Sequence, residues 1–200
     1  MLELRLIAPI TIFYAAPRSG KTYLAVESIR QSLKDGRQVV TNIPVNIPNV
    51  YRFDTAILDG APVYDSDIYL DEAYQYFNSR NFKSFSSSMH EFFSLCGHYG
   101  NRLVLIAQHP ARLDKVIREN TSYYVKAVAF RFFTGTPIFF RYHIYDVDPS
   151  MISSSSEARK LKPVRSHTVL FRRSIARLYD THNLRPSDPP LPLRLWVEDE

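Results

Sequence analysis

The amino-acid sequence predicts an α/β fold, with a mostly parallel sheet, helices on both faces and an antiparallel hairpin at one edge. Short apolar runs typical of buried strands alternate with segments of helical periodicity up to about residue 145. A loop of about four residues around Gly135 then joins two longer strand-like segments, which is typical of a hairpin. Since no apolar run approaches the ~20 residues of a membrane-spanning helix, we expect no transmembrane segment.

Each element is predicted from a local pattern. Strands are expected where apolar runs end in polar or turn-forming residues, at residues 10–14, 38–41, 68–70, 102–107, 123–133 and 138–147. Helices are expected where apolar residues recur every three or four positions, at residues 23–33, 82–99 and 111–120. Asp35-Gly36 stops the first helix. Residues 43–66 indicate a loop with one weak strand or helix near 51–58.

The composition changes after Asp148-Pro149, so we predict a core over residues 1–149 and a basic extension over 150–200. A serine run at 153–156 reads as a linker, and the chain ends in a proline-rich tail. Residues 101–200 hold 16 Lys and Arg against 10 Asp and Glu. This excess indicates either contact with phosphates or a solvated basic tail. The single cysteine, Cys96, excludes internal disulfides and points to a reducing compartment.

A candidate phosphate-binding loop (P-loop) lies between the first strand and the first helix. It consists of Ala15, Ala16, Pro17, Arg18, Ser19, Gly20, Lys21 and Thr22. Backbone N–H groups of such a loop and the helix N-terminus hold phosphate oxygens, and Gly20 allows close approach. Lys21 would neutralise the β- and γ-phosphates, and the Thr22 hydroxyl would coordinate Mg²⁺. The strand before and the helix after favour this interpretation over a chance match, and predict the three-layer P-loop NTPase fold with ATP and Mg²⁺ as cofactors.

A carboxylate at the end of a buried strand is the second element that such a site needs. Asp71 follows the apolar residues 68–70 and would hold the magnesium shell, while Glu72 would polarise the attacking water. An acidic pair can also simply begin a helix, but its position at a strand end favours the functional interpretation. Gln108 ends the next buried strand, where it either senses the γ-phosphate or merely terminates the strand.

An arginine acting across subunits would stabilise charge on the transferred phosphoryl group. The candidates are Arg80, Arg102 and Arg118, of which we select Arg118. For any one of these arginines, an ordinary role at the surface or in a salt bridge is more common than a catalytic role.

The chain resembles the zonula occludens toxin-like ATPases, which include the assembly protein of filamentous phages. The motifs that carry the resemblance lie at residues 13–22, 36–44, 70–80, 97–100, 103–108, 116–118 and 178–182. The Thr-Asn-Ile-Pro segment ending at Pro44 and the Asp-Glu-Ala segment beginning at Asp71 are the most specific of them. The resemblance implies a P-loop ATPase akin to ring-forming DNA pumps, which works at the inner membrane to export single-stranded phage DNA.

Carried onto this chain, the resemblance implies that Lys21 and Thr22 bind nucleotide and metal, that Asp71 and Glu72 hold metal and activate water, and that Gln108 is the strand-end glutamine. There are two departures. Ala15 and Arg18 stand where the family has glycine, so we expect a stiffer loop with altered nucleotide affinity. Family members also continue into a membrane-spanning helix and a periplasmic part, neither of which is in this sequence.

The function expected from these features is ATP hydrolysis coupled to translocation of phage DNA during virion morphogenesis, by extrusion through the cell envelope. The alternatives are a genome-packaging ATPase of a tailless icosahedral phage and a non-motor, nucleotide-dependent assembly scaffold. Expected partners are phage DNA of either strandedness, further copies of the chain in a ring, and a membrane-anchored or capsid protein. The expected location is the host cytoplasm or the inner-membrane surface.

The basic residues from Lys126 onward are expected to contact DNA phosphates. Tyr123, Tyr124, Phe139 and Phe140 either stack on bases or fill the sheet core, and their alternation favours the core.

Overall fold

The structure is a computed structural model, and it describes residues 8–61, 63–77, 87–132, 135–148 and 161–179. The strands are β1 (Ile10–Tyr14), β2 (Gln38–Thr41), β3 (Val50–Arg52), β4 (Ser66–Leu70), β5 (Arg102–Ala107), β6 (Tyr123–Arg131), β7 (Pro137–Tyr145) and β8 (Arg165–Leu170). The helices are α1 (Lys21–Lys34), α2 (Ser87–Leu95), α3 (Lys115–Glu119) and α5 (Arg173–Ala176), with short 3₁₀ turns η1 (Thr55–Ile57), η2 (Ala73–Gln75) and η3 (Pro110–Arg112).

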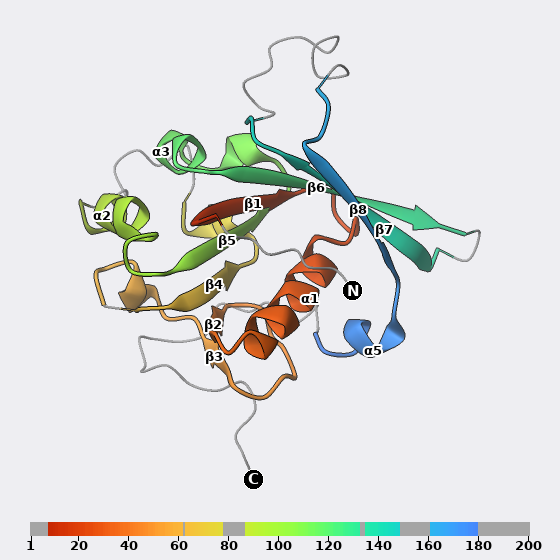
Figure 1. Cartoon of the computed structure of the whole chain (residues 1–200), viewed down its shortest axis with the longest axis horizontal. Coiled ribbons are helices and arrows are strands. Elements are labelled where there is room, and N and C mark those ends of the chain that lie inside the picture. The colour runs from red at the N-terminus through yellow and green to blue at the C-terminus, as the bar shows by residue number, and fades with distance from the viewer. Residues whose placement is uncertain (1–7, 62, 78–86, 133–134, 149–160, 180–200) are drawn as a thin grey trace.

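All eight strands form one sheet in the order β3-β2-β4-β5-β1-β6-β7-β8 (Figure 1). The strands from β3 to β6 run parallel, whereas β7 pairs antiparallel with both β6 and β8. The predicted fold class, a mostly parallel sheet with an antiparallel hairpin at its edge, is therefore confirmed. Strand β8, which extends that hairpin, was not among the predicted strands.

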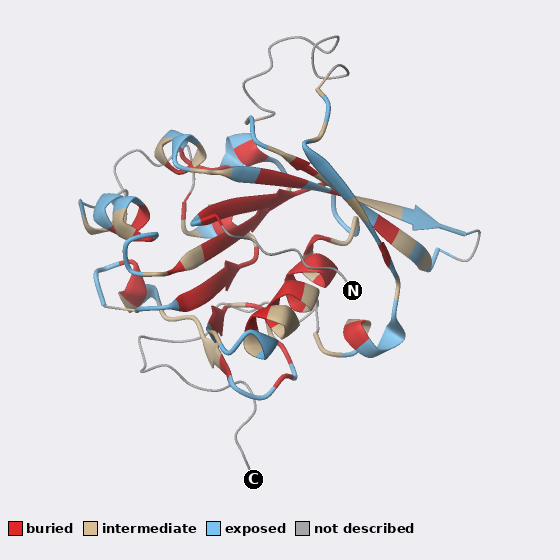
Figure 2. Ribbon diagram, in the orientation of Figure 1, coloured by how far each residue is buried: buried red, intermediate tan, exposed pale blue. Residues whose placement is uncertain are grey.

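Helices cover both faces of the sheet, whose central strands are buried (Figure 2). Successive residues of these strands alternate between two cores. In β1, Phe13 packs into the core beneath α1, while Ile12 and Tyr14 pack into the core beneath α2 and α3. Helix α1 buries Leu24, Val26 and Ile29 against the first face because apolar residues recur at helical spacing. The sheet is therefore the middle layer of three.

Two predicted helices differ from the structure in their extent. Residues 111–120 do not form one helix: the extended backbone of Leu113 separates η3 from α3, and Asp114 caps α3 by accepting from the N–H of Val116. Helix α2 lies within the predicted range 82–99, of which residues 82–86 lie outside the described part of the chain. The weak element expected near 51–58 consists of β3 and η1.

Residues 161–179 pack against the rest of the molecule. Strand β8 pairs with β7, and Ile175 of α5 is buried in the α1 core. Tyr179 forms a β-bridge with Val45, in the loop that follows β2. The boundary at residue 149 stays a prediction, and the serine run at 153–156 and the proline-rich tail lie outside the described residues. No helix within the described ranges is long and apolar enough to span a membrane.

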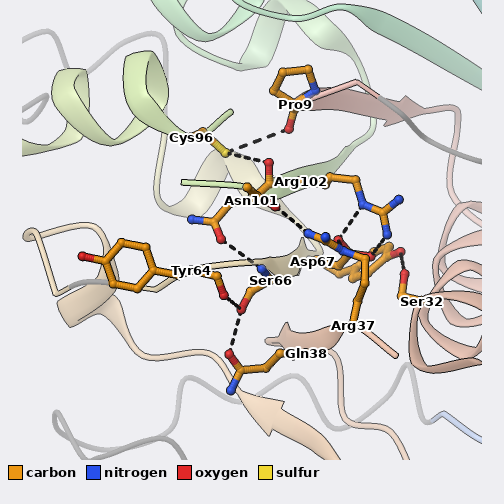
Figure 3. Close-up of polar contacts among 12 residues, drawn as sticks. Pro9, Ser32, Arg37, Gln38, Tyr64, Ser66, Asp67, Cys96, Asn101 and Arg102 are labelled. Carbon is orange, nitrogen blue, oxygen red and sulfur yellow. Dashed lines mark hydrogen bonds and ion pairs between the residues drawn. The ribbon is translucent and has the colours of Figure 1, made fainter. Parts of the chain in front are cut away.

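The amino ends of the parallel strands are held together by a buried carboxylate (Figure 3). Asp67 near the start of β4 is 1% exposed and accepts from the guanidinium groups of Arg37 and Arg102. Both Nε–Oδ1 distances are 2.6 Å, and Arg37 also donates to the carbonyl of Gly100. Because Arg37 precedes β2 and Arg102 begins β5, Asp67 ties three neighbouring strands together.

We expect Asp67→Ala to lower the free energy of unfolding by about 3–5 kcal/mol, because it leaves two partly buried guanidinium groups without their carboxylate. Chemical denaturation followed by circular dichroism measures this loss. Asp59→Ala, at an exposed position, is the control and should change the free energy of unfolding by no more than about 0.5 kcal/mol. Equal stability of the two variants would contradict the role given to Asp67.

Candidate functional site

The loop of residues 15–20 leaves the carboxyl end of β1 and leads directly into α1. Gly20 adopts φ 94° at the helix N-cap, and its carbonyl accepts the first helical hydrogen bond from Leu24 N–H at 3.0 Å. Arg18 also has a positive φ, 59°, a conformation that costs a residue with a side chain about 1–2 kcal/mol. The chain therefore forms a tight turn with Arg18 at a position where glycine would be unstrained.

Lys21 reaches back across this loop. Its ammonium donates to the carbonyls of Ala15 at 2.9 Å and Ala16 at 3.0 Å, and the residue is only 7% exposed. Burial lowers the pKa of Lys21, and the neighbouring Asp71 and Glu72 partly offset that change. The positive charge of Lys21 is thus held beside the loop and close to two acidic residues.

Thr22 and Asp71 are brought together across the sheet. Strands β1 and β4 end at the same edge, and the Thr22 hydroxyl donates to Asp71 Oδ2 at 2.8 Å. Asn42, at the end of β2, fixes the backbone of Asp71 on both sides. Its Oδ1 accepts from Asp71 N–H at 2.7 Å, and its amide donates to the Asp71 carbonyl at 2.9 Å. The loop and the strand-end carboxylate therefore form one site.

Glu72 lies beside this pair with φ 48°, and its N–H donates to Asp71 Oδ1 at 2.8 Å. Gln108, which follows β5, is close enough to Glu72 for its side chain to lower the pKa of that carboxyl. The second carboxylate oxygen, Oε2, is buried without a partner among the described residues. Burial and the charge of Asp71 raise the pKa of Glu72, and burial likewise raises the pKa of Asp71.

The antiparallel strand β7 packs against the loop from the other side. The ring of Phe140 lies where a side chain on Gly20 would be, since a Cβ there would come within 2.3 Å of Phe140 Cδ1. Tyr142 donates its hydroxyl to the Gly20 carbonyl at 3.3 Å, and Arg131 of β6 donates to the Arg18 carbonyl. The loop is thus supported by the same strands that extend the sheet.

We expect Gly20→Ala to destabilise the protein and weaken nucleotide binding, because the added methyl group must displace Phe140 as well as adopt a positive φ. Gly36→Ala is a matched control, since Gly36 also has a positive φ (73°) but its Cβ would meet no atom within 4 Å. Thermal melting and nucleotide titration of both variants separate the two effects. Equal losses would mean that backbone strain alone matters.

The arginine candidates are placed differently. Arg118 of α3 donates to Asp148 Oδ2 at 2.8 Å and so is paired within its own chain. Arg102 lies at the amino edge of the sheet, opposite the loop, and Arg80 lies outside the described residues. Arg112, which the sequence reasoning did not select, is close enough to Glu72 for its charge to lower the pKa of that carboxyl.

Three features of the site were missed at the level of sequence. Asn42 was part of the Thr-Asn-Ile-Pro segment but received no role, although its position at a strand end was a usable signal. Phe140 and Tyr142 contact the loop only because tertiary folding brings β7 next to it, and no local sequence pattern marks this contact. A buried ammonium, a hydroxyl and two carboxylates are thereby gathered where backbone amides begin a helix, an arrangement suited to binding and hydrolysing a nucleoside triphosphate.

The fold and this site together define a P-loop ATPase. Within that class, the profile of the family described as Zonular occludens toxin (Zot) matches residues 9–59 and 55–182. The chain therefore belongs to the Zot family, as its motifs predicted. Comparison with curated protein sequences finds no match.

Solved structures share the fold. The N-terminal domain of zonular occludens toxin from Neisseria meningitidis matches with a TM-score of 0.59 at 18% identity, over 86% of this chain and 99% of that one. The genome-packaging NTPase B204 from Sulfolobus turreted icosahedral virus 2, in complex with sulfate, matches with a TM-score of 0.52 at 15% identity, over 70% and 92%. The ATPase domain of a further protein gives a TM-score of 0.54 at 9% identity, over 86% and 84%.

Proposed function

We propose that this chain couples ATP hydrolysis to translocation of phage DNA during virion morphogenesis. The observation that carries the ATPase part is the hydrogen bond between Thr22 and Asp71, because it places a strand-end carboxylate at the start of the P-loop helix. The DNA part is supported by the likeness to B204, which is described as a DNA-packaging ATPase, and by the excess of basic residues in the second half.

In this proposal the residues of the loop, from Ala15 to Thr22, hold the triphosphate. Backbone N–H groups of the loop would face the phosphates, and Lys21 would leave the carbonyls of Ala15 and Ala16 to neutralise the β- and γ-oxygens.

The donors present fit a magnesium ion. Thr22 Oγ1 and Asp71 Oδ2 are hard oxygen ligands 2.8 Å apart, and these two residues would hold the ion in place of their mutual hydrogen bond. Among the described residues, no three His, Cys, Asp or Glu side chains gather as metal ligands, so further ligands would be phosphate and water oxygens. When bound, the ion would offset the negative charge of the phosphates.

Glu72 is the proposed general base. Its unpartnered Oε2 can accept a proton from a water molecule, and its raised pKa makes it a stronger base than an exposed glutamate. Gln108 lies near the Glu72 carboxyl, whose pKa it lowers, and in this proposal it would sense the γ-phosphate. Glu72 and Gln108 would therefore both act at the γ-phosphate and its attacking water.

In a ring of several copies, a neighbouring subunit would supply a further positive charge to the nucleotide site. We assign Arg118 of a neighbouring subunit to the transferred phosphoryl group. Because Arg118 is paired with Asp148 in its own chain, assembly has to compete with that ion pair. Sedimentation with ATP and Mg²⁺ tests this assignment: the chain should form larger assemblies, and Arg118→Ala should assemble but hydrolyse ATP slowly.

ATPase rates of the full chain, measured with and without DNA, test the proposed function. DNA is expected to stimulate hydrolysis, and sedimentation with either DNA form reports which strandedness binds. Hydrolysis that is indifferent to all DNA would contradict the translocation function and favour a scaffold. Fractionation of infected cells separates extrusion, which needs the ATPase at the inner membrane, from packaging, which needs it at a capsid.

We expect the pH dependence of hydrolysis to follow Glu72 and Lys21. Because the pKa of Glu72 is raised, the active carboxylate is lost as pH falls at values above the ~4.3 of an ordinary glutamate. Because the pKa of Lys21 is lowered, its charge is lost on the alkaline side before that of an exposed lysine. The burial cost of ionised Glu72 is present above its folded-state pKa and is relieved as pH falls. A pH–rate profile whose acid limb persists in Glu72→Gln would contradict this assignment.

A further inference from the structure

Strands β6, β7 and β8 present two different faces. Their inward residues, such as Val125, Phe140 and Val169, are buried in the core beneath α1. Because side chains alternate along a strand and the register is fixed, the residues between them lie together on the opposite side. We call this side the outer face, and it consists of Lys126, Val128, Phe130, Phe139, Arg141, His143, Ser166, Thr168 and Leu170.

The outer face is basic. Lys126 and Arg141 are exposed, and no residue of the face is acidic. Arg141 donates to the Thr168 hydroxyl at 3.4 Å, and His143 pairs with the Ser166 hydroxyl at 2.8 Å, which confirms that neighbouring strands present these groups on one side. Burial and the charges of Arg141 and Lys126 lower the pKa of His143. Lys126 pairs with His143 and Val128 pairs with Arg141, so Lys126 and Arg141 are diagonal neighbours on adjacent strands.

The part of the outer face next to the turn between β6 and β7 is aromatic and apolar. Phe130 and Phe139 stack with ring centroids 4.4 Å apart and an interplanar angle of 18°. Leu170 is opposite Phe139 on β8 and is 65% exposed, while Phe130 is 40% exposed. Much of β8 is exposed in Figure 2. Large apolar side chains left open beside basic ones mark a surface for a partner with both apolar and anionic parts.

We propose that the outer face binds single-stranded DNA, with phosphates at Lys126 and Arg141 and unpaired bases on Phe130 and Phe139. This rests on the proposed function and names its DNA contact surface. A single strand offers bases for stacking, whereas duplex DNA keeps its bases inside and would leave the aromatic pair exposed. A second copy of the face is a poor partner, because Lys126 and Arg141 would meet like charges.

Fluorescence anisotropy of labelled oligothymidylate with the full chain tests this surface. The double variant Lys126→Glu/Arg141→Glu should bind at least about tenfold more weakly, and the slope of log affinity against log salt should fall by roughly two. Lys34→Glu/Lys115→Glu is the matched control: it makes the same charge change on exposed residues of α1 and α3 and should leave affinity within about twofold. Phe130→Leu keeps an apolar side chain beside Phe139 but should cost roughly fivefold or more.

The possible results distinguish an error in the DNA-binding surface from an error in the proposed function. If the wild type binds oligothymidylate and the outer-face and control variants bind equally, the surface assignment is wrong while the translocation function stands. If the wild type hydrolyses ATP but neither binds nor responds to any DNA, both are wrong. Tighter binding of duplex than of oligothymidylate overturns the single-strand assignment. A change in sedimentation confined to the outer-face variants would show instead that copies of the chain meet there.

Discussion

Replacing Lys21 by alanine is expected to lower the rate of ATP hydrolysis by at least about a hundredfold, the usual cost of removing one group that stabilises transition-state charge. Lys21 is the buried cation held against the carbonyls of Ala15 and Ala16, next to Asp71 and Glu72. Alanine removes the charge that would neutralise the β- and γ-phosphates. Phosphate release from ATP, measured with the full chain at saturating Mg²⁺, gives the rate.

The matched control for this variant is Lys34→Ala. Lys34 is the last residue of the same helix and is exposed, so its loss should change neither the rate nor the melting temperature appreciably. Equal rates in Lys21→Ala and the wild type would show that the loop is not the site of hydrolysis. If Lys21→Ala failed to fold, Lys21→Arg would keep a buried positive charge, and we expect it to remain folded with a much reduced rate.

Glu72→Gln should reduce hydrolysis by about 10²–10⁴-fold while leaving nucleotide bound, since it removes the proposed proton acceptor and keeps the shape of the side chain. The glutamine keeps a polar side chain near Gln108, but it cannot accept the proton that the unpartnered Oε2 would take. Removing a carboxylate next to Asp71 also relieves like-charge repulsion, so the variant should be at least as stable as the wild type. Single-turnover hydrolysis and nucleotide titration measure the two quantities separately.

Glu91→Gln on α2 is the control, because Glu91 is exposed and the change is chemically the same. It should hydrolyse ATP at the wild-type rate. Hydrolysis that survives in Glu72→Gln would assign the base to another residue. Loss of nucleotide binding in Glu72→Gln would give Glu72 a structural role instead.

The sheet could be predicted from sequence where strands are buried on both faces. Strands such as β1 and β5 are continuous apolar runs, and a run of that kind has few alternatives in a soluble domain. Strand β8 was missed because only Val169 in it is buried, and an exposed edge strand carries almost no apolar pattern. The break at Leu113 was missed because helical periodicity continues across it, although η3 ends at Leu113 and Asp114 caps the start of α3.

The site, like the sheet, could be predicted from sequence only in part. The loop and the Asp71-Glu72 pair are local motifs next to a strand, so their types and spacing could be recognised from the chain alone. The clamp of Asn42 on Asp71 depends on β2 lying beside β4, and the contacts of Phe140 and Tyr142 with Gly20 depend on β7 folding back over α1. Sheet order and tertiary packing decide these contacts, and one sequence does not state them.

Strand β7 has a position that links two events. Its inward residues Phe140 and Tyr142 touch the phosphate loop at Gly20, and its outward residue Arg141 belongs to the proposed DNA surface. If binding of either ligand shifted this strand, the shift would reach the other binding site directly. Thermodynamic reciprocity then requires that, if ATP alters the affinity for DNA by some factor, DNA alters the affinity for ATP by the same factor. The nine residues of β7 would then couple nucleotide binding to DNA binding.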